Sequence, residues 1–393
     1  MVKRLGLCLT AVALLIGVVG CGKPSVAQTP ISEVISSPEP TVRSRTTALK
    51  YKLEDVKSLK TQPLTMTVKK LAPKDYITDI TFEKWTGDDL VIAIPNSNPT
   101  AEVGLSKGRY NRITLLSGGK ILAQYDTADQ DVTDITLLPD KMLVKTRQKI
   151  NNVYVPGIAE IGYDGKFLWG LGIDKLSHSV EPLPNGNFLI MRGDYDQAIE
   201  MTRDGKIAWE WNAMEGIPQF SNQTFVAYAD RTEPTYNIYN EFRMPTPNGD
   251  IWTHANAVQK LADGYLISLR NLSMCVKVGF DKKIQWTFGA LLIKYQHRPR
   301  ILDNGNILIY DNGNGRVVEF KPTGEVVFEY PIYSAVWGCV DKLSNGNYIF
   351  PSCFEGIIYE VTPDKEVVKK VQMGKMPLIR AYMAKDALAW VNK

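Results

Sequence analysis

The sequence predicts an all-β fold, a six-bladed β-propeller, and three observations support this. A hairpin phrase with Asn-Gly or Asp-Gly between apolar runs recurs along the chain, and these dipeptides are the strongest short-range hairpin signal. A second strand–turn–strand pattern follows each copy. The hairpin glycines Gly264, Gly305 and Gly346 are 41 residues apart. Four short antiparallel strands in about 40 residues are typical of one propeller blade.

The repeats also set the boundaries of the blades. We count six units, one near 76–125 and the others opening near 131, 177, 253, 296 and 337. The interval from Gly186 to Gly264 is 78 residues, almost twice the period, and the segment 213–250 is rich in turn residues. We therefore expect a propeller over residues 76–393 with a long loop insertion near 213–250.

Residues 1–20 have the pattern of a bacterial lipoprotein signal peptide. Lys3 and Arg4 precede an apolar run that is short for a membrane span, and the run ends in Val-Val-Gly-Cys. This ending resembles a lipobox, in which the cysteine is lipidated and becomes the first residue. We expect Cys21 to anchor the protein to a bacterial membrane, facing the periplasm or the cell exterior. The alternative is an ordinary signal peptide that contains a cysteine.

Residues 21–75 are weakly patterned, and Ser, Thr, Pro and Lys are frequent in them. We expect a solvated tether with a strand or two near its end. The net charge of +4 is too small to indicate nucleic-acid binding. The sequence has neither zinc-type cysteine spacing nor a glycine-rich phosphate loop, so no cofactor is indicated.

The chain has three histidines, and each opens a repeat. His178 lies 8 residues before Gly186, His297 lies 8 before Gly305, and His254 lies 10 before its hairpin glycine. The first strand of every blade lines the central channel, so equivalent residues of different blades converge around one axis. We expect the three imidazoles to share one mouth of the channel, together with Asn256, two residues past His254.

Arginines fall on the returning strands of the same hairpins. Arg192 and Arg270 each follow their hairpin glycine by 6 residues, and Arg147 and Asp311 occupy the aligned positions in blades two and five. Imidazole can act as a nucleophile or a proton carrier near neutral pH. The guanidinium fork suits sulfate, phosphate or carboxylate. The set indicates an anionic group that is held and transferred.

Several other interpretations remain open at this point. One histidine near a strand end can be structural, and one arginine can simply pair with an acid such as Asp311 or Asp194. Three imidazoles around an axis could also bind zinc. The protein could therefore be a non-catalytic propeller lipoprotein that binds a ligand or partner, or a hydrolase or metal enzyme that uses the same histidines.

The chain resembles the bacterial arylsulfate sulfotransferases that do not use the nucleotide sulfate donor. The matching motifs are H-x-x-x-P-L-P-N-G at His178, W-x-H-x-N-x-V at Trp252, I-S-x-R at Ile267 and QH…LDNGNILIYDNG from Gln296. They occur in the family's order and at similar spacing. The resemblance covers the propeller and implies transfer of a sulfuryl group from an aryl sulfate to a phenol through a sulfohistidine.

The resemblance also implies roles for individual residues. His297 would be the nucleophile, His254 the general acid and base, and Asn256, Arg270 and His178 would bind the sulfate oxygens. From the repeat position we add Arg192 as a substrate-binding candidate. The implied partners are phenols and aryl sulfates, and the implied chemistry needs no metal and no cofactor.

The sequence departs from the family in three places. Family members often carry a separate β-sandwich domain before the propeller, and here only about fifty weakly patterned residues stand in that place. The last blade offers only Ser334 or Gly338 where the family has a small hydroxyl residue, and Arg298 directly after the nucleophile has no interpretation.

Outside the cytoplasm, Cys339 and Cys353 could form a disulfide, and we expect Cys275 to be a buried apolar residue.

Overall fold

The computed structural model describes residues 56–85, 90–95, 111–128, 130–150, 153–216, 253–289, 291–334, 337–374 and 378–384. The predicted signal peptide, Cys21, the first part of the predicted tether and most of the predicted insertion lie outside the described residues.

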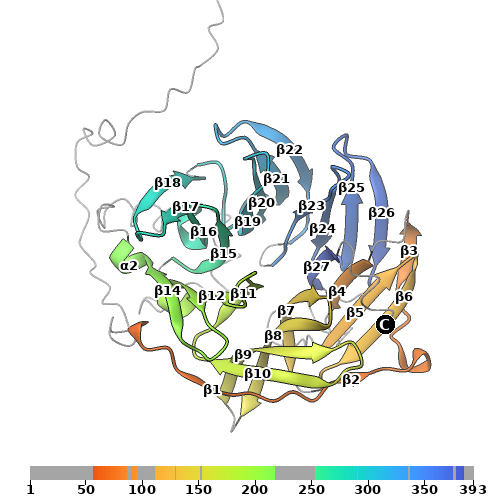
Figure 1. Ribbon diagram of the computed structural model, residues 1–393. Helices are drawn as coiled ribbons and strands as arrows, with labels where there is room; N and C mark the ends of the chain where they lie inside the picture. Colours follow the sequence, from red (N-terminus) through yellow and green to blue (C-terminus); the bar gives the residue numbers. More distant parts are fainter. Residues whose placement is uncertain are drawn as a thin grey trace, which may run out of the picture. The chain divides into compact units, whose positions relative to one another are not determined.

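Six antiparallel sheets form the six blades of a propeller and stand in a ring (Figure 1). Blade two contains β7 (Asp131–Leu138), β8 (Lys141–Ile150), β9 (Val153–Gly162) and β10 (Phe167–Ile173). Blade three contains β11 (Ser177–Pro182), β12 (Phe188–Arg192), β13 (Gln197–Met201) and β14 (Ile207–Asn212). Blade four contains β15 (Ala255–Leu261), β16 (Gly264–Leu269), β17 (Met274–Gly279) and β18 (Ile284–Phe288).

The remaining strands complete blades five, six and one. Blade five contains β19 (His297–Ile301), β20 (Ile307–Asp311), β21 (Arg316–Phe320) and β22 (Val326–Pro331). Blade six contains β23 (Asp341–Lys342), β24 (Tyr348–Ser352), β25 (Ile357–Val361) and β26 (Val367–Gln372). Blade one contains β27 (Leu378–Ala384), β4 (Leu90–Pro95), β5 (Arg112–Ser117) and β6 (Lys120–Asp126).

Blade one joins the two ends of the propeller. Its innermost strand is the C-terminal β27, which pairs with β4 so that Ala381 faces Ala93. The strand β3 (Thr81–Lys84), which we placed in this blade from the sequence, instead forms the outer edge of blade six beside β26. The unit expected near 76–125 therefore divides between two sheets. The ring closes by non-local pairing, which a local repeat pattern does not reveal.

The chain before the propeller covers two of its outer edges. Strand β1 (Thr61–Pro63) pairs with β10, and β2 (Lys69–Lys70) pairs with β6. A short 3-10 helix, Pro73–Asp75, follows. Unpaired edge strands invite pairing with other chains, so these additions protect the edges of blades two and one. The described part of the predicted tether thus contains the two strands.

The Asn-Gly-Asn hairpin of blade three is linked to blade four through a buried acid. Asn185 and Asn187 donate to Glu200 Oε1 at 2.9 and 2.8 Å, while Lys260 and Tyr265 of blade four donate to Oε2 at 2.6 and 2.8 Å. Burial alone would raise the pKa of Glu200, but these four hydrogen bonds outweigh it and lower the pKa to about 2. The Glu200 carboxylate is therefore charged, and both of its oxygens accept hydrogen bonds.

The same arrangement recurs at the interface between blades five and six. Glu319 accepts hydrogen bonds from Asn306 at 2.6 Å, from Lys342 at 2.7 Å and from Tyr348 at 2.8 Å. We call these two hydrogen-bonded carboxylates the Glu200 clamp and the Glu319 clamp. Beside them, aromatic rings of neighbouring blades stack. The ring centroids of Trp209 and Tyr265 are 3.8 Å apart. The sequence repeat thus encodes contacts between blades as well as hairpins within them.

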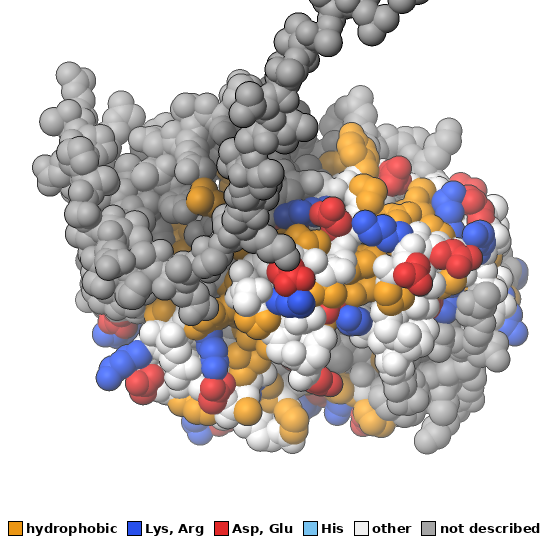
Figure 2. Space-filling view, turned by 90° about the horizontal axis from the view of Figure 1, so that it is seen from above, with side chains coloured by type: hydrophobic (Ala, Val, Ile, Leu, Met, Phe, Trp, Pro, Cys, Tyr) orange, Lys and Arg blue, Asp and Glu red, His pale blue; other side chains and the backbone are white. Residues whose placement is uncertain are grey.

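The core lies between adjacent sheets. Between blades three and four, for example, Leu189 and Met191 of β12 pack with Val258 and Ile267 of the next blade, and all four are buried. On the outside, acidic and basic side chains intermix over the described part of the face in Figure 2. That part of the face has no extended basic area of the kind that binds nucleic acid.

Candidate active site

The structure brings the three histidines together at the inner strands. The ring centroids of His178 and His254 are 4.8 Å apart, and those of His178 and His297 are 5.9 Å apart. Their strands β11, β15 and β19 lie side by side around the centre of the ring (Figure 1). His297 is buried at 2% exposure, whereas His178 and His254 are half-buried. The cluster is therefore open on the side of the latter two rings.

A local break in strand pairing aims each ring. The pairing shifts between Ser177 and Val180 in β11, between Ala255 and Ala257 in β15, and between His297 and Arg300 in β19. Such bulges bend a strand and re-aim its side chains, and they are frequent beside active sites.

The backbone is left-handed at the same places. The φ angles are 55° at His178, 48° at His254 and 44° at Arg298. For non-glycine residues this conformation costs free energy and persists only where the surroundings enforce it. Beside His254, Asp196 of blade three accepts a hydrogen bond from the Thr253 amide at 2.8 Å. This bond ties the start of β15 to the neighbouring blade.

His297 has a fixed partner for one ring nitrogen. Its Nδ1 lies 2.8 Å from Oδ1 of Asn312, which is also buried. Asn312 follows β20 in a short 3-10 helix, Asn312–Asn314, and its Nδ2 donates to the Ser334 and Trp337 carbonyls at 2.9 Å each. Sequence reasoning missed Asn312. The signal that could have found it is its place in the D-N-G turn beside the strand of His297.

Asn256 lies close to the backbone of the His297 strand. Its Nδ2 donates to the Gln296 carbonyl at 2.8 Å, and its buried Oδ1 has no hydrogen-bond partner among the described residues. The side chain of Gln296 in turn donates to Ser268 Oγ and the Met274 carbonyl. These contacts join blade four to blade five immediately beside the nucleophile candidate.

Arg270 also lies beside the His297 strand. It follows β16 in the 3-10 helix Arg270–Leu272, and its guanidinium stacks over the ring of Tyr295 with 4.9 Å between the guanidinium carbon and the ring centroid. Tyr295 precedes His297 by two residues. One Nη of Arg270 donates to Asn271 at 3.0 Å. The side chain is half-buried, so it retains a solvent-facing surface on which an anion can bind.

Arg192 does not belong to the site, and its assignment as a substrate-binding residue was wrong. Its side chain is 0% exposed, and all five N–H groups are used. They donate to the carbonyls of Val56, Ser58 and Asp174, to the Asp174 carboxylate, and to Gln197 Oε1. Arg192 thus fastens the N-terminal segment to blade three and has no donor left for an anion.

The other two aligned positions are structural as well. Arg147 pairs with Asp131 at 2.7 Å and stacks over Tyr154. Asp311 accepts from the Lys294 amide at 2.7 Å and pairs with Arg316 at 3.0 Å. Among the four aligned side chains, Arg270 is the one whose guanidinium stacks over Tyr295, two residues before His297.

Two ion pairs join β19 to inner strands of other blades. Arg298 of blade five lies 3.6 Å from Asp134 of blade two, which stands opposite it in the ring. Arg300 of the same strand pairs with Glu181 of blade three at 2.8 Å. These residues were not predicted as a unit, because nothing local in the sequence relates strands so far apart. The ion pair with Asp134 gives Arg298 an interpretation: it links two opposite blades across the channel.

Packing explains why position 338 in the last blade lacks the hydroxyl residue that the family resemblance led us to expect. Ser334 Oγ donates to the Trp337 carbonyl at 2.6 Å and so organises the loop that holds Asn312. Gly338 has a φ of 142°, and a Cβ there would lie 2.1 Å from the ring of Tyr310. A hydroxyl-bearing residue therefore does not fit at 338.

The cysteines differ from the sequence-based expectation of a disulfide. Among the described residues, Cys275, Cys339 and Cys353 are all buried thiols. In the register that pairs Asp341 with Ile349, Cys339 would face Pro351 rather than Cys353. Cys353 Sγ lies 3.8 Å from the hydroxyl of Tyr310. Cys275 is buried in the apolar core, as expected.

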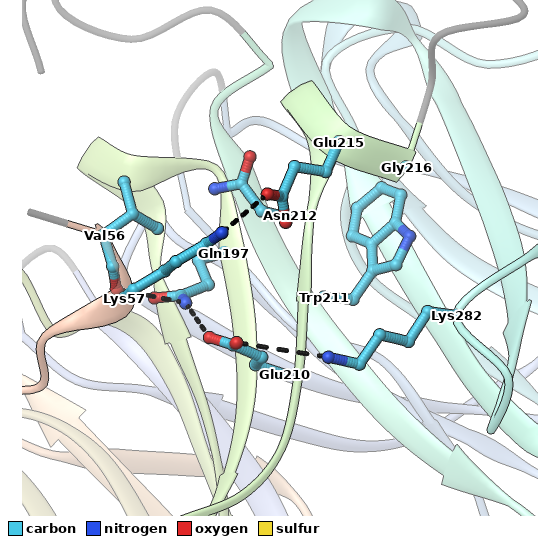
Figure 3. A pocket seen from close by; sticks show the side chains of 9 residues that line it. All are labelled: Val56, Lys57, Gln197, Glu210, Trp211, Asn212, Glu215, Gly216 and Lys282. Carbon is cyan, nitrogen blue, oxygen red and sulfur yellow. Dashed lines mark hydrogen bonds and ion pairs between the residues drawn. The ribbon is translucent and has the colours of Figure 1, made fainter. Parts of the chain in front are cut away.

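A small hollow lies apart from the histidines (Figure 3). It has a volume of about 80 Å³ and lies beside β14, the short helix α2 (Ala213–Gly216) and the N-terminal segment. Glu210 and the ion pair of Lys57 with Glu215, at 3.2 Å, line it. No residue of the histidine cluster lines it. Within the described chain, no group of three or more His, Cys, Asp or Glu side chains could hold a metal ion.

The fold and the site together define a β-propeller whose inner strands gather imidazole, amide and guanidinium groups suited to an anionic ligand. The chain belongs to the arylsulfotransferase (ASST) family. One family profile with that description matches residues 107–291, and a second with the same description matches residues 239–393. Family membership supports arylsulfotransferase activity in general. No curated protein shows significant sequence similarity to the chain.

Solved structures show more distant likenesses. A protein of unknown function from Bacteroides caccae is 12% identical, with a TM-score of 0.49, over 76% of this chain and 100% of that one. A catalytically inactive virginiamycin B lyase from Staphylococcus aureus is 13% identical, with a TM-score of 0.38, over 61% and 70%. A chain of a nidogen/laminin complex is 9% identical, with a TM-score of 0.47, over 76% and 98%.

Proposed function

We propose that the protein transfers a sulfuryl group from an aryl sulfate to a phenol through a sulfohistidine at His297. The observation that carries this proposal is the geometry of His297. Its ring is buried, its Nδ1 is bound by Asn312, and a second imidazole lies with its centroid 5.9 Å away. A nucleophile held in one orientation beside a proton carrier is the arrangement that covalent catalysis requires.

In the first half-reaction, Nε2 of His297 attacks the sulfur of the aryl sulfate. The N–S bond forms as the S–O bond to the ring breaks, and the electron pair of that bond leaves on the phenolate oxygen. His254, as the imidazolium, gives this oxygen a proton. The half-reaction leaves sulfohistidine, a free phenol and a neutral His254.

The second half-reaction reverses these steps with a different phenol. His254 takes the proton from the acceptor hydroxyl while its oxygen attacks the sulfur. The N–S bond breaks and its electron pair returns to Nε2 of His297. Charge develops on the three sulfate oxygens in both transfers, and in this proposal His178, Asn256 and Arg270 stabilise it.

The proposal is tested by transfer from p-nitrophenyl sulfate to phenol, read by the release of coloured nitrophenolate. We expect His297→Asn to abolish transfer and to abolish a mass-tagged sulfuryl group on the histidine peptide. The matched control is Arg147→Met, which removes the aligned arginine of blade two and should leave transfer intact. Binding of aryl sulfate without turnover would favour the non-catalytic propeller. Activity that a chelator removes would favour the metal enzyme.

We propose further that Cys21 carries a lipid anchor, on the evidence of the basic start, the apolar run and the Val-Val-Gly-Cys ending. In the part of the chain that the structure describes, no helix is long and apolar enough to span a bilayer. We expect Cys21→Ser to abolish incorporation of labelled fatty acid and to release the protein from the membrane fraction. Cys8→Ser, inside the apolar run, is the control and should remain lipidated. Equal labelling of the Cys21→Ser protein would refute the anchor.

A further inference from the structure

The two ends of the Asn312 side-chain amide are identified by their partners. Nδ2 lies 2.9 Å from both the Ser334 and the Trp337 carbonyls, and only an NH₂ group can donate to two carbonyl oxygens. The end that faces His297 Nδ1 at 2.8 Å is therefore the oxygen. Asn312 and His297 are 4% and 2% exposed, so water does not compete for this contact.

An amide oxygen only accepts, so Nδ1 of His297 is the protonated nitrogen whenever the ring is neutral. The lone pair of the ring then lies on Nε2. We propose that Asn312 is a positioning residue that fixes this tautomer and so makes Nε2 the nucleophile. The inference rests on the proposed function, because it assigns the atom that forms the N–S bond.

A neutral acceptor also suits the second half of the reaction. After attack, the ring holds the sulfuryl group on Nε2 and the proton on Nδ1, so it carries a positive charge. A carboxylate partner would stabilise this charge strongly, whereas an amide stabilises it less. The ring therefore remains a good leaving group when the acceptor phenol attacks, and the electron pair of the N–S bond returns to a neutral imidazole.

The surroundings prevent the Asn312 side-chain amide from flipping by about 180°. Ser334 Oγ donates to the Trp337 carbonyl at 2.6 Å, which fixes one of the two oxygens that Asn312 binds. Gly338 packs under the ring of Tyr310, whose hydroxyl donates to the Pro351 carbonyl at 2.6 Å. A reversed amide would set its oxygen against two carbonyls, and both contacts would be repulsive.

Two variants separate the acceptor of Asn312 from its donors. Asn312→Asp keeps an oxygen that can accept from Nδ1 but loses the NH₂ group, whereas Asn312→Leu loses both. We expect the native protein and Asn312→Asp to show a protonated Nδ1 and an unprotonated Nε2 at His297 in ¹⁵N NMR of histidine-labelled protein. Asn312→Leu should lose this preference and lower kcat on the order of 10²- to 10⁴-fold, as wrong-tautomer substitutions do elsewhere.

Asn314→Ala is the matched control, since Asn314 lies in the same 3-10 helix but bonds to Asp311 and Leu292 instead. It should leave the tautomer and kcat unchanged. The inference is overturned if native His297 carries its proton on Nε2, or if Asn312→Leu keeps both the native tautomer and the native kcat. The NMR reading needs no turnover. A protein with the expected tautomer but without transfer activity would therefore refute the proposed function and leave the role of Asn312 standing.

Discussion

Arg298 and Asp134 face each other across the axis of the propeller, with 3.6 Å between the Arg298 Nη1 and Asp134 Oδ1 atoms. The two residues lie on the innermost strands of opposite blades, and Arg298 directly follows the proposed nucleophile. Asp134 is buried and also accepts from the amides of Ile135 and Val180 at 3.1 and 3.4 Å. The pair thus links the position of the His297 strand to a blade on the other side of the ring.

Removal of Arg298 should therefore destabilise the fold. In Arg298→Leu the Asp134 carboxylate stays buried without the opposite charge of the guanidinium, which we expect to lower the free energy of unfolding by about 2 kcal/mol. The double variant with Asp134→Leu should recover part of this loss. Urea denaturation of the four proteins measures the coupling.

The exposed pair of Lys166 with Asp164, at 2.7 Å, provides the control for this cycle. Lys166→Leu should leave the free energy of unfolding almost unchanged, because both side chains of this pair are solvated. If the losses from Arg298→Leu and Asp134→Leu simply add, the two residues do not interact across the channel.

The local periodicity was enough to predict the blades and the convergence of the histidines. Asn-Gly hairpins report on neighbouring residues, and a repeated hairpin implies a repeated place around the axis. The pairing of β27 with β4 was not predictable in this way, because residues almost 300 positions apart share no local pattern. The same reason hid the partner of Arg298.

The histidine register shows the finer limit of sequence reasoning. His297 pairs with Tyr310, but the residues in the equivalent pairs of blades three and four are Ser177 and Ala255, not the histidines. His178 follows its strand position by one residue and His254 precedes its own by one. Bulges and left-handed backbone bring the rings together nonetheless, and spacing from a glycine does not encode either feature.

Arg192 and Arg270 occupy the same repeat position and should respond differently to mutation. Arg192→Met removes five buried hydrogen bonds, so we expect a loss of about 3 kcal/mol in the free energy of unfolding and little change in kcat/KM of the folded protein. Proteolysis should then cut more readily near Val56. Arg147→Met, at an aligned but half-exposed position, should cost less than about 1 kcal/mol. A fully stable Arg192→Met protein would contradict the structural assignment.

Arg270→Ala should show the opposite pattern. The side chain is half-buried beside the His297 strand, where its guanidinium stacks over the Tyr295 ring and donates to Asn271. We expect kcat/KM for p-nitrophenyl sulfate to fall on the order of 10²-fold through loss of charge stabilisation, with little change in melting temperature. Arg270→Lys should recover only a small part, because the ammonium group lacks the planar fork. Unchanged kcat/KM in Arg270→Ala would remove Arg270 from the site.

The Glu200 clamp predicts an acid-side loss of stability. The ordinary pKa of the carboxyl is 4.5, and hydrogen bonds in the folded state lower it to about 2. The unfolded chain therefore binds this proton at higher pH than the folded protein does. The stability that Glu200 contributes is complete above 4.5 and is lost as the pH falls toward about 2.

Glu200→Gln tests this directly. The variant should melt at a lower temperature than the native protein at neutral pH, and the difference should shrink as the pH falls below 4.5. Asp303→Asn removes a carboxyl exposed at a hairpin and controls for the change in net charge. A difference in melting temperature that stays constant with pH would show that the clamp does not depend on the charge of Glu200.

Gly338 offers a test of why the family's hydroxyl residue is absent from this position. The φ of 142° at position 338 is rarely adopted by residues other than glycine, and a Cβ there would lie 2.1 Å from the Tyr310 ring. We therefore expect Gly338→Ser to destabilise the fold by about 1–3 kcal/mol. Displacement of the ring would also move the loop that binds Asn312, so we expect lower kcat rather than improved transfer.

The double variant Gly338→Ser with Tyr310→Leu removes the clash and should recover part of the stability, since only the backbone strain then remains. Gly356→Ser, at a φ of 66° outside this contact, controls for introducing a serine at a glycine with positive φ. Higher activity in Gly338→Ser at native stability would mean that the channel accepts a hydroxyl there and that packing against Tyr310 does not exclude it.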